Sequence, residues 1–443
     1  MPATPLDSEI YKALLGDAEL RALFTDSADV RAMLVVEGTL AKVQGDLGVI
    51  PEESAKAIHR ASLELQIDPA ALAPTTGQNA VPVPALVAAF RKEMNAPEHA
   101  QFVHWGATSQ DIIDTALALR VKRVLELFEA RLSRLLSALA NLSGRHATLP
   151  LAARTYGQVA TVTSLGALTA GWGRPLLEAR GDLSRIRNTC LNVSLSGAAG
   201  TLAAMGSNGP EIRAGLADGL GLSVPDGSWH SDRRGPATLA AWLTLIAGAL
   251  GKLGHDLHQM AQSGVEEITF SAGGRSSTMP QKANPVQAVL LGAIARQIVA
   301  LNAVVQGGLL HERERDGAAW ISEWLSLPQM CLLTGRALSV ADEACTALTP
   351  MPDAMARNID PEGTGLIYAE ALTFALSQIM PRPEAQAKIA ALCTEARETG
   401  ASLASLVARD HPGDWAACAT PEAQLGQAPA EARAFAARVR ADG

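Results

Sequence analysis

The sequence predicts an all-α protein built around a bundle of long helices. Apolar residues make up 48% and charged residues 19% of the 443 residues, which is enough apolar surface for a large core. Aromatic residues contribute only 4%, and β-branched residues are few beside alanine and leucine, so the composition favours helix over sheet. Several segments keep an apolar period of three to four residues over lengths that are rare in compact globules. Together they indicate a bundle that is shared between subunits.

The chain divides, in order, into shorter helices, five long helices and a tail. Within the first hundred residues, 28–48 and 82–94 have apolar positions at helical spacing. Long helices are then expected over about 111–147, 158–187, 236–267, 284–310 and 320–347. The tail from about Pro350 is alanine-rich and predicts a small separate helical domain.

Composition and charge exclude several classes of protein. The net charge of −8 argues against a broad nucleic-acid surface, although a small anionic substrate responds only to its local site. Five scattered cysteines without a CxxC pair, and no signal peptide at the start, indicate a cytoplasmic protein. The most apolar window, 236–251, is too short to span a bilayer and meets Lys252, so we expect a buried helix and no membrane association. His255 and His258 have no third ligand nearby, so no metal site is expected.

Polar residues gather in four segments that interrupt this apolar pattern. The first, HWGATSQD at 104–111, precedes the first long helix, which Thr108 or Ser109 can cap. A cap needs no histidine beside it, so His104 makes the segment a candidate site as well as a capping loop. The second, ARTYGQ at 153–158, is on its residues alone better explained as an ordinary loop.

The third polar segment, GGRSSTMPQKANP at 273–285, has the chemistry of an anion site. Its glycines leave backbone N–H groups accessible, and Asn284 followed by Pro285 is a strong helix start. A carboxylate is favoured at such a helix N-terminus, and Lys282 adds a full positive charge. The alternative is a flexible surface loop, which the lysine, the asparagine and the paired serines together disfavour.

The fourth polar segment, HERERDGAAWISEW at 311–324, is typical of a solvated charged face. Trp320 and Trp324, four residues apart, are better explained as core residues than as ligand contacts. A further stretch, SGAAGTLAAMG at 196–206, is rich in small residues and predicts close packing or a turn.

Taken together, these segments resemble the fumarase/aspartase superfamily, which includes argininosuccinate and adenylosuccinate lyases. GRSSTMPQKANP is similar to the long and specific signature GSSxMPxKxNP, HWGATSQD resembles the first substrate-binding region, and SGAAGTLAAMG resembles a further segment. The order and spacing agree over most of the chain. Within the superfamily, HWGATSQDIIDT, the HERxxxxxWxxEW pattern and LVVEGTLAKVQGDLGVIP resemble the bacterial cycloisomerases that act on a carboxymuconate.

The resemblance implies a fold, an assembly and a set of site residues. The fold would have three helical domains, 1–110, 111–349 and 350–443, in a homotetramer whose active sites are each built from three subunits, without metal or cofactor. Ser276, the first serine of the signature, would exchange a proton with carbon, and Lys282 and Asn284 would hold a substrate carboxylate. His104 is the third catalytic candidate. The other candidate substrate-binding residues are Thr108, Ser109, Thr155, Tyr156, Gln158 and Arg275.

Two departures from the superfamily pattern bear on activity. Arg275 stands where a glycine is usual, and either contacts an additional anionic group or alters the motion of the loop. Tyr156 stands where the lyases carry histidine in an RTH motif, which favours a cycloisomerase and leaves the second acid/base partner open.

The expected substrate is therefore a small di- or tricarboxylate, 3-carboxymuconate or a 3-substituted analogue such as a sulfonate. An adenylosuccinate lyase-like C–N lyase is the alternative within the superfamily, but it would need a histidine at Tyr156. A non-catalytic structural protein of the same fold is the alternative outside enzymology, and the intact polar loops argue against it.

Overall fold

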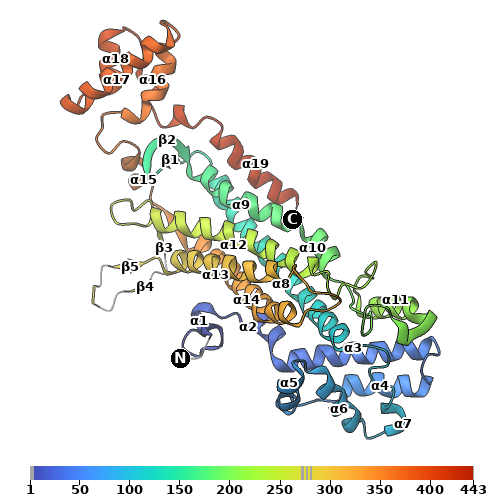
Figure 1. Ribbon diagram of the computed structural model, residues 1–443. Helices are drawn as coiled ribbons and strands as arrows, with labels where there is room; N and C mark the ends of the chain where they lie inside the picture. Colours follow the sequence, from blue (N-terminus) through green and yellow to red (C-terminus); the bar gives the residue numbers. More distant parts are fainter. Residues whose placement is uncertain (1–3, 271–273, 276–277, 280–281, 443) are drawn as a thin grey trace. The chain divides into compact units, whose positions relative to one another are not determined.

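The computed structural model describes residues 4–270, 274–275, 278–279 and 282–442, with only the backbone of Arg275. Contacts within the chain divide it into two compact units. The first unit comprises the residues up to Arg131, Ala179–Ala247 and Ile294–Ala337, and the second comprises the remaining stretches. The all-α prediction is confirmed (Figure 1). The division into the domains 1–110, 111–349 and 350–443 stays a prediction.

Five long helices each contain a boundary between the units: α8 (Ser109–Arg145), α9 (Leu165–Gly181), α12 (Arg234–Met260), α13 (Val286–Gly307) and α14 (Gly317–Ala347). Four of the predicted long segments are confirmed by α8, α12, α13 and α14, with ends that differ by a few residues. Helix α8 is long because neither proline nor glycine interrupts it before Gly144 and its buried positions recur every three to four residues. Helix α12 ends at Met260, seven residues earlier than predicted, ahead of a turn that contains Gly264 at φ 84°.

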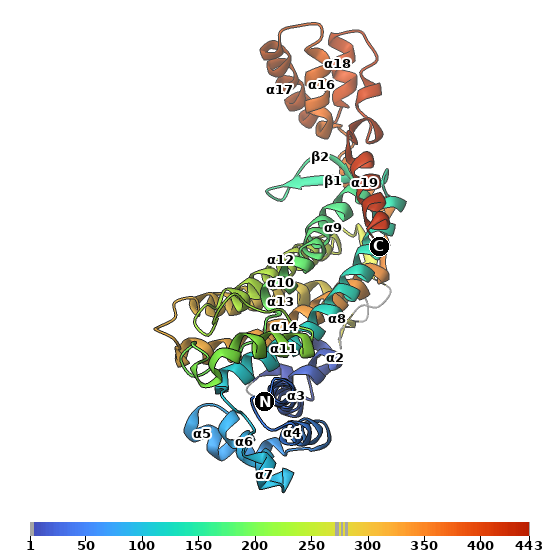
Figure 2. The same cartoon turned by 90° about the vertical axis from the view of Figure 1, so that its right-hand side faces the viewer.

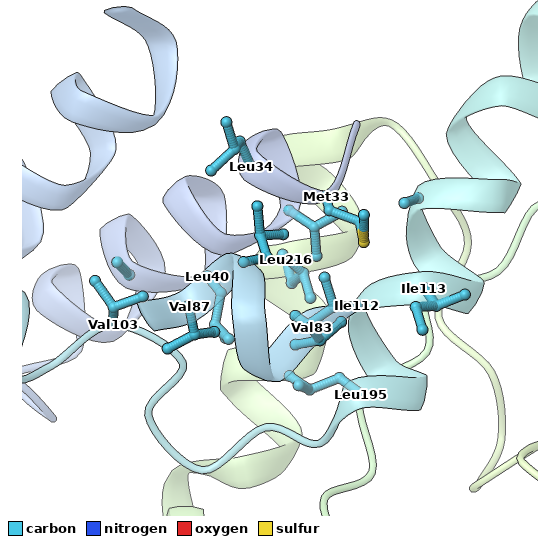
Figure 3. Packing of buried hydrophobic residues seen from close by; sticks show 14 of the residues in the cluster. Met33, Leu34, Leu40, Val83, Val87, Val103, Ile112, Ile113, Leu195 and Leu216 are labelled. Atoms are coloured by element: carbon cyan, nitrogen blue, oxygen red, sulfur yellow. The ribbon is translucent and has the colours of Figure 1, made fainter. Parts of the chain in front are cut away.

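Shorter helices complete the first unit: α1 (Lys12–Leu15), α2 (Ala18–Arg21), α3 (Asp26–Asp46), α4 (Glu52–Glu64), α5 (Ala73–Asn79), α6 (Val83–Met94), α7 (Pro97–Ala100), α10 (Leu183–Cys190) and α11 (Gly209–Leu220). Their core joins residues far apart in the sequence. Figure 3 shows Leu40, Ile112 and Leu216, from α3, α8 and α11, packed into the same cluster of buried side chains. This cluster anchors the start of α8 and so fixes the position of the preceding HWGATSQD segment.

Helices α3 and α4 pack unusually closely, and they lie side by side in Figures 1 and 2. A Cβ atom at Gly38 would overlap the Ser62 side chain, and one at Gly45 would overlap the Ala55 methyl group. Both glycines therefore stand where a larger residue would force the helices apart.

In the second unit, the predicted helix over 158–187 is wrong at its start. Residues 150–164 instead form an antiparallel hairpin of β1 (Pro150–Thr155) and β2 (Gln158–Ser164), which leads into α9 (Figure 2). The two linking residues, Tyr156 and Gly157, have φ of 52° and 79°, as a two-residue hairpin turn requires. Alternating valine and threonine in β2 also suit a strand, a pattern that the helical reading overlooked.

The base of the hairpin packs against the C-terminal helices α15 (Pro352–Ile359), α16 (Ala369–Leu376), α17 (Arg382–Thr399), α18 (Leu403–Asp410) and α19 (Ala428–Ala441). Ala152 and Val162 share one core cluster with Leu372 and Leu392 of these helices. The predicted helical tail is confirmed.

Two further strand pairs lie in the second unit. Strand β3 (Ile268–Phe270) pairs with β6 (Leu348–Pro350), and β4 (Gly274–Arg275) pairs with β5 (Ala283–Asn284). Helix α13 begins at Val286, and the Val289 N–H donates to the Pro285 carbonyl. Asn284 therefore belongs to a strand, which corrects the prediction that it caps the helix with Pro285 in the first turn.

Two helices, α12 and α13, are long and apolar enough to cross a membrane by length and composition alone. Inside the structure, 61% of the apolar window of α12 is buried, in agreement with the predicted buried helix, against 44% for α13. Helix α13 leaves Val286, Val289, Val299 and Val304 exposed, and we call these four residues the α13 apolar face.

The close packing of α3 on α4 makes Gly45→Ala a test of the core. The new methyl group meets Ala55, which has no rotamer that could make room, so we expect a loss of about 1–3 kcal/mol of unfolding free energy. Denaturant unfolding measures the change. Gly171→Ala is the control, because it lies in helix α9 with no atom near its added methyl group and should be neutral or stabilising. Equal stability of the two variants would contradict the packing described here.

Candidate functional site

A buried carboxylate organises the polar segments of the first unit. Asp111 stands at the third position of α8, and its Oδ2 accepts the Thr108 N–H at 3.0 Å, which completes half of a capping box. The same side chain accepts the backbone N–H groups of Ser196 at 2.8 Å and Gly197 at 2.9 Å. Asp111 thus ties the HWGATSQD segment to the SGAAG segment. Thr108 occupies the predicted cap position, with Ser109 as the first helical residue.

A buried histidine, His230, is the fourth partner of this carboxylate. Its Nε2 lies 2.8 Å from Asp111 Oδ1, and its backbone oxygen accepts from Gln110 at 3.0 Å. Thr115 exchanges hydrogen bonds of 3.1 and 2.8 Å with the backbone of Ser194. The start of α8 therefore holds the segment at 194–197 through two side chains one turn apart, Asp111 and Thr115.

Arg315, from the fourth polar segment, joins the same cluster. Its Nε donates to Gln110 Oε1 at 2.8 Å, and its Nη2 lies 3.3 Å from both Thr108 Oγ1 and the Ala198 carbonyl. The Arg315 side chain is exposed, as a solvated charged face predicts, and it also contacts this cluster through these hydrogen bonds. The exposed guanidinium lies where a bound anion could reach it together with the Thr108 hydroxyl.

His104 is held by a second buried carboxylate. Its Nδ1 lies 2.6 Å from Glu37 Oε1, and the Glu37 side chain is only 1% exposed against 20% for His104. Burial lowers the pKa of His104, but the charge and the hydrogen bond of Glu37 outweigh it, so the pKa is raised above its ordinary value. His104 also has φ of 63°, so the backbone and the carboxylate together fix its ring.

A buried cluster of ion pairs lies next to the start of α8. Arg233 donates to Asp114 at 2.7 and 3.2 Å and to Glu323 at 2.8 and 2.6 Å. Burial raises the pKa of Glu323, although Arg233 opposes that shift. Trp320, which is 3% exposed, donates to Asp114 at 2.9 Å, so its interpretation as a core residue is confirmed.

In the second unit, Arg154 forms a bidentate pair with Glu267. Arg154 donates through two nitrogens at 2.7 and 3.1 Å, and Glu267 is fully buried and accepts also from Asn358 at 3.0 Å. This pair thus anchors the turn end of the hairpin, because Arg154 pairs with Val159 next to the turn. A cavity of about 480 Å³ lies beside it, lined in part by Lys252, Asp256 and Gln259.

The three candidates of the second polar segment lie at the exposed end of the hairpin. Thr155 pairs with Gln158, and both are exposed. Tyr156 at the tip is fully exposed to solvent. The structure places these residues together around one turn, and Gly157 between them lines the cavity beside Arg154.

The signature segment is described only in part. Ser276 lies outside the described residues, and of Arg275 only the backbone, paired with Ala283, is described. Lys282 is exposed, and Asn284 is half-buried in β5. The candidates therefore fall into two sets. The first unit holds His104, Thr108 and Ser109, and the second holds Arg275, Lys282, Asn284 and the hairpin residues.

Sequence reasoning missed Glu37, His230 and Arg315 as neighbours of the candidate residues. No local pattern identifies the first two, because Glu37 lies 67 residues before His104 and His230 lies 119 residues after Asp111. Asp111 itself carried a signal, since an acidic residue three positions after a threonine matches a capping box. Among the described residues, no three histidine, cysteine, aspartate or glutamate side chains are placed to hold a metal ion.

Comparison with known proteins found relatives that are similar over nearly the whole chain. The family described as Lyase matches residues 16–300. A 3-carboxy-cis,cis-muconate cycloisomerase of Pseudomonas aeruginosa is 36% identical over 411 residues, covering 91% of this chain and 89% of that protein. A nitrosuccinate lyase of Streptomyces davaonensis is 35% identical, covering 91% and 88%. The crystal structure of the 3-carboxy-cis,cis-muconate lactonizing enzyme from Pseudomonas putida superposes with a TM-score of 0.91 at 31% identity, over 98% of this chain and 99% of that one.

The contacts of Asp111 lead to a stability prediction. Asp111→Asn replaces one carboxylate oxygen by an NH2 group, which then faces backbone N–H groups or His230 and cannot accept their hydrogen bonds. Because a buried hydrogen bond is lost, we expect the free energy of unfolding to fall by about 3 kcal/mol. Denaturant unfolding at neutral pH checks this value. Asp232→Asn is the matched control, because that exposed carboxylate pairs only locally with Arg234 and should cost less than about 0.5 kcal/mol. An unchanged stability in Asp111→Asn would rule out its central role.

Proposed function

The chain belongs to the lyase family of the fumarase/aspartase superfamily of enzymes, and on that premise we propose that it is a 3-carboxy-cis,cis-muconate cycloisomerase. The single observation that carries the proposal is the similarity of nearly the whole chain to relatives of that name. Tyr156 in place of the lyase histidine supports the same assignment.

The reaction is an intramolecular addition. One substrate carboxylate attacks a carbon of the C=C bond, a C–O bond forms, and the π electrons move to the neighbouring carbon as an enediolate on its carboxylate. One proton is then added to that carbon, and a five-membered lactone results. Because the nucleophile is already ionised, the enzyme has to orient the chain, stabilise the enediolate and deliver the proton.

The second unit supplies the groups for the developing charge. Lys282 and Asn284 stabilise the enediolate by placing a cation and an amide beside it, next to the start of α13. Ser276 delivers the proton to carbon, and Arg275 is placed to favour an additional anionic group, such as the sulfonate of a 3-substituted analogue. Thr155, Tyr156 and Gln158 bind the substrate from the hairpin.

The first unit holds the remaining carboxylates. His104, Thr108 and Ser109 lie on the segment that Asp111 fixes, and Arg315 adds a guanidinium beside the Thr108 hydroxyl. These positions suit a substrate with several negative charges, since each carboxylate needs a donor or a cation when it leaves water.

The proposed assembly is a cytoplasmic homotetramer with three domains per chain and active sites shared between three subunits, without metal or cofactor. Two observations support the association of subunits. The α13 apolar face is exposed in the single chain, and Tyr156 at the tip of the hairpin is fully exposed. Its substrate is a small anionic tricarboxylate, with no nucleic acid or membrane partner.

A C–N lyase is the second candidate, favoured by one observation. The nitrosuccinate lyase relative is nearly as similar as the cycloisomerases. A lyase would remove a proton from carbon and release fumarate from a substituted succinate, whereas the cycloisomerase adds a proton to carbon.

Substrate assays separate the two candidates. With purified enzyme and 3-carboxy-cis,cis-muconate we expect loss of the diene ultraviolet absorbance and formation of the lactone, and we expect no fumarate from nitrosuccinate or adenylosuccinate. 3-Sulfomuconate is the informative analogue for Arg275. Turnover of a succinate but not of the muconate would replace the proposal by the lyase alternative.

Variants of the signature segment test the assigned roles. Ser276→Ala should lower kcat by about a thousandfold, because the proton donor is lost, with the fold and the assembly intact.

Lys282→Met should raise KM and lower kcat, because a cation next to the enediolate is removed. Lys388→Met, in the C-terminal helices, is the control and should keep full activity. Near-normal turnover in Ser276→Ala would remove Ser276 from its role.

A further inference from the structure

The pair formed by Glu37 and His104 has a feature that the reaction scheme leaves unexplained. Glu37 lies in the middle of α3, where its side chain is 1% exposed, and no cation other than His104 reaches it among the described residues. Its second oxygen, Oε2, is buried without a hydrogen-bond partner in that part of the chain. A buried carboxylate with half of its acceptor capacity unused is costly unless a positive charge lies against it.

The contact itself has the geometry of a charged pair. The separation of 2.6 Å between Glu37 Oε1 and His104 Nδ1 is at the short end for a nitrogen–oxygen hydrogen bond, as expected when both groups are ionised. Because Nδ1 is committed to Glu37, Nε2 is the ring nitrogen that remains for a ligand. The positive φ of His104 and the hydrogen bond from Gln44 to the Trp105 carbonyl, 2.8 Å, hold the backbone on both sides of this arrangement.

We propose that Glu37 is a positioning residue that keeps His104 doubly protonated, so that His104 binds a substrate carboxylate as a cation through its Nε2–H. His104 therefore does not act as the general base, and the missing lyase histidine at position 156 is not replaced by it. The identity of the anion rests on the proposed function, whereas the charge state of His104 does not.

The other charged groups around His104 are compatible with this state. Asp111 at the start of α8 favours the imidazolium, and Arg91 of α6, which donates to the Val103 carbonyl at 2.9 Å, opposes it. Burial also opposes it, yet Glu37 prevails and the pKa of His104 is raised. His104 is therefore an imidazolium at any pH below the ordinary pKa of histidine, and it stays charged at pH values somewhat above it. The charge is lost only as the pH rises through the raised pKa.

The wild-type protein provides the first test, without any substrate. The C2 hydrogen of an imidazole exchanges with deuterium at a rate that depends on protonation, so the pH profile of exchange, read by mass spectrometry, gives the pKa of each histidine. Fragmentation has to separate His104 from His99. We expect a midpoint for His104 above about 6.5, the ordinary value. A midpoint at or below that value overturns the proposal, whatever the substrate proves to be.

Variants give the second test. Glu37→Gln keeps the shape but removes the charge, so the His104 midpoint should fall by at least one pH unit and KM for 3-carboxymuconate at pH 8 should rise about tenfold, with kcat changed less. Lowering the pH should restore KM in this variant, because His104 regains its proton. Asp46→Asn, on the same helix and paired with Lys42 at the surface, is the control and should change neither quantity. If Glu37→Gln does not fold, Glu37→Asp, which keeps the charge, replaces it in the same two measurements.

The possible results are decisive in each case. A midpoint that does not move in Glu37→Gln, or one that moves while KM stays constant, contradicts the proposal. If the wild-type protein does not convert 3-carboxymuconate at all, the proposed function fails, but the exchange midpoints still decide the charge state of His104.

Discussion

The carboxylate of Asp111 is the interaction on which the first unit's candidate site depends. One buried side chain accepts three backbone N–H groups and faces a buried histidine, and it stands at the N-terminus of the longest described helix. A helix start favours negative charge, and each N–H would be costly if left unpaired in the interior. The same contacts that satisfy these groups bring together two loops that lie more than eighty residues apart in the chain. The hydrogen bonds of Asp111 therefore determine both the stability of this region and the geometry of its loops.

Carboxylates are also used in the rest of the site, but in different ways. Glu267 neutralises Arg154 in a bidentate pair, so that arginine is fixed next to the turn of the hairpin. Asp114 and Glu323 share Arg233 under the first-unit loops. Glu37, in contrast, faces a histidine that is 20% exposed and leaves one oxygen without a hydrogen-bond partner among the described residues. The carboxylates that pair with an arginine have hydrogen-bond partners for both oxygens and serve the structure. The Glu37 carboxylate, with one unpaired oxygen, lies where a ligand is expected.

The long helices and the helical tail were predictable from the sequence, because apolar periodicity persists over many turns and local propensity agrees with it. The hairpin was not, because valine and threonine at 158–164 compete with a neighbouring helix and the turn at Tyr156 lacks the usual asparagine or aspartate. The signature segment and His104 were identified by their residue types and by resemblance. Glu37 and His230 were not, since their partners lie 67 and 119 residues away and only the packed core brings them together.

The turn at the tip of the hairpin has an evolutionary consequence. Tyr156 has a left-handed backbone, a conformation that histidine adopts more readily than most residues with a side chain. An ancestor could therefore have exchanged histidine for tyrosine here, or the reverse, with no backbone barrier and no rearrangement of the scaffold. The packed cores of the fold would accommodate either side chain, because position 156 is fully exposed at the hairpin tip.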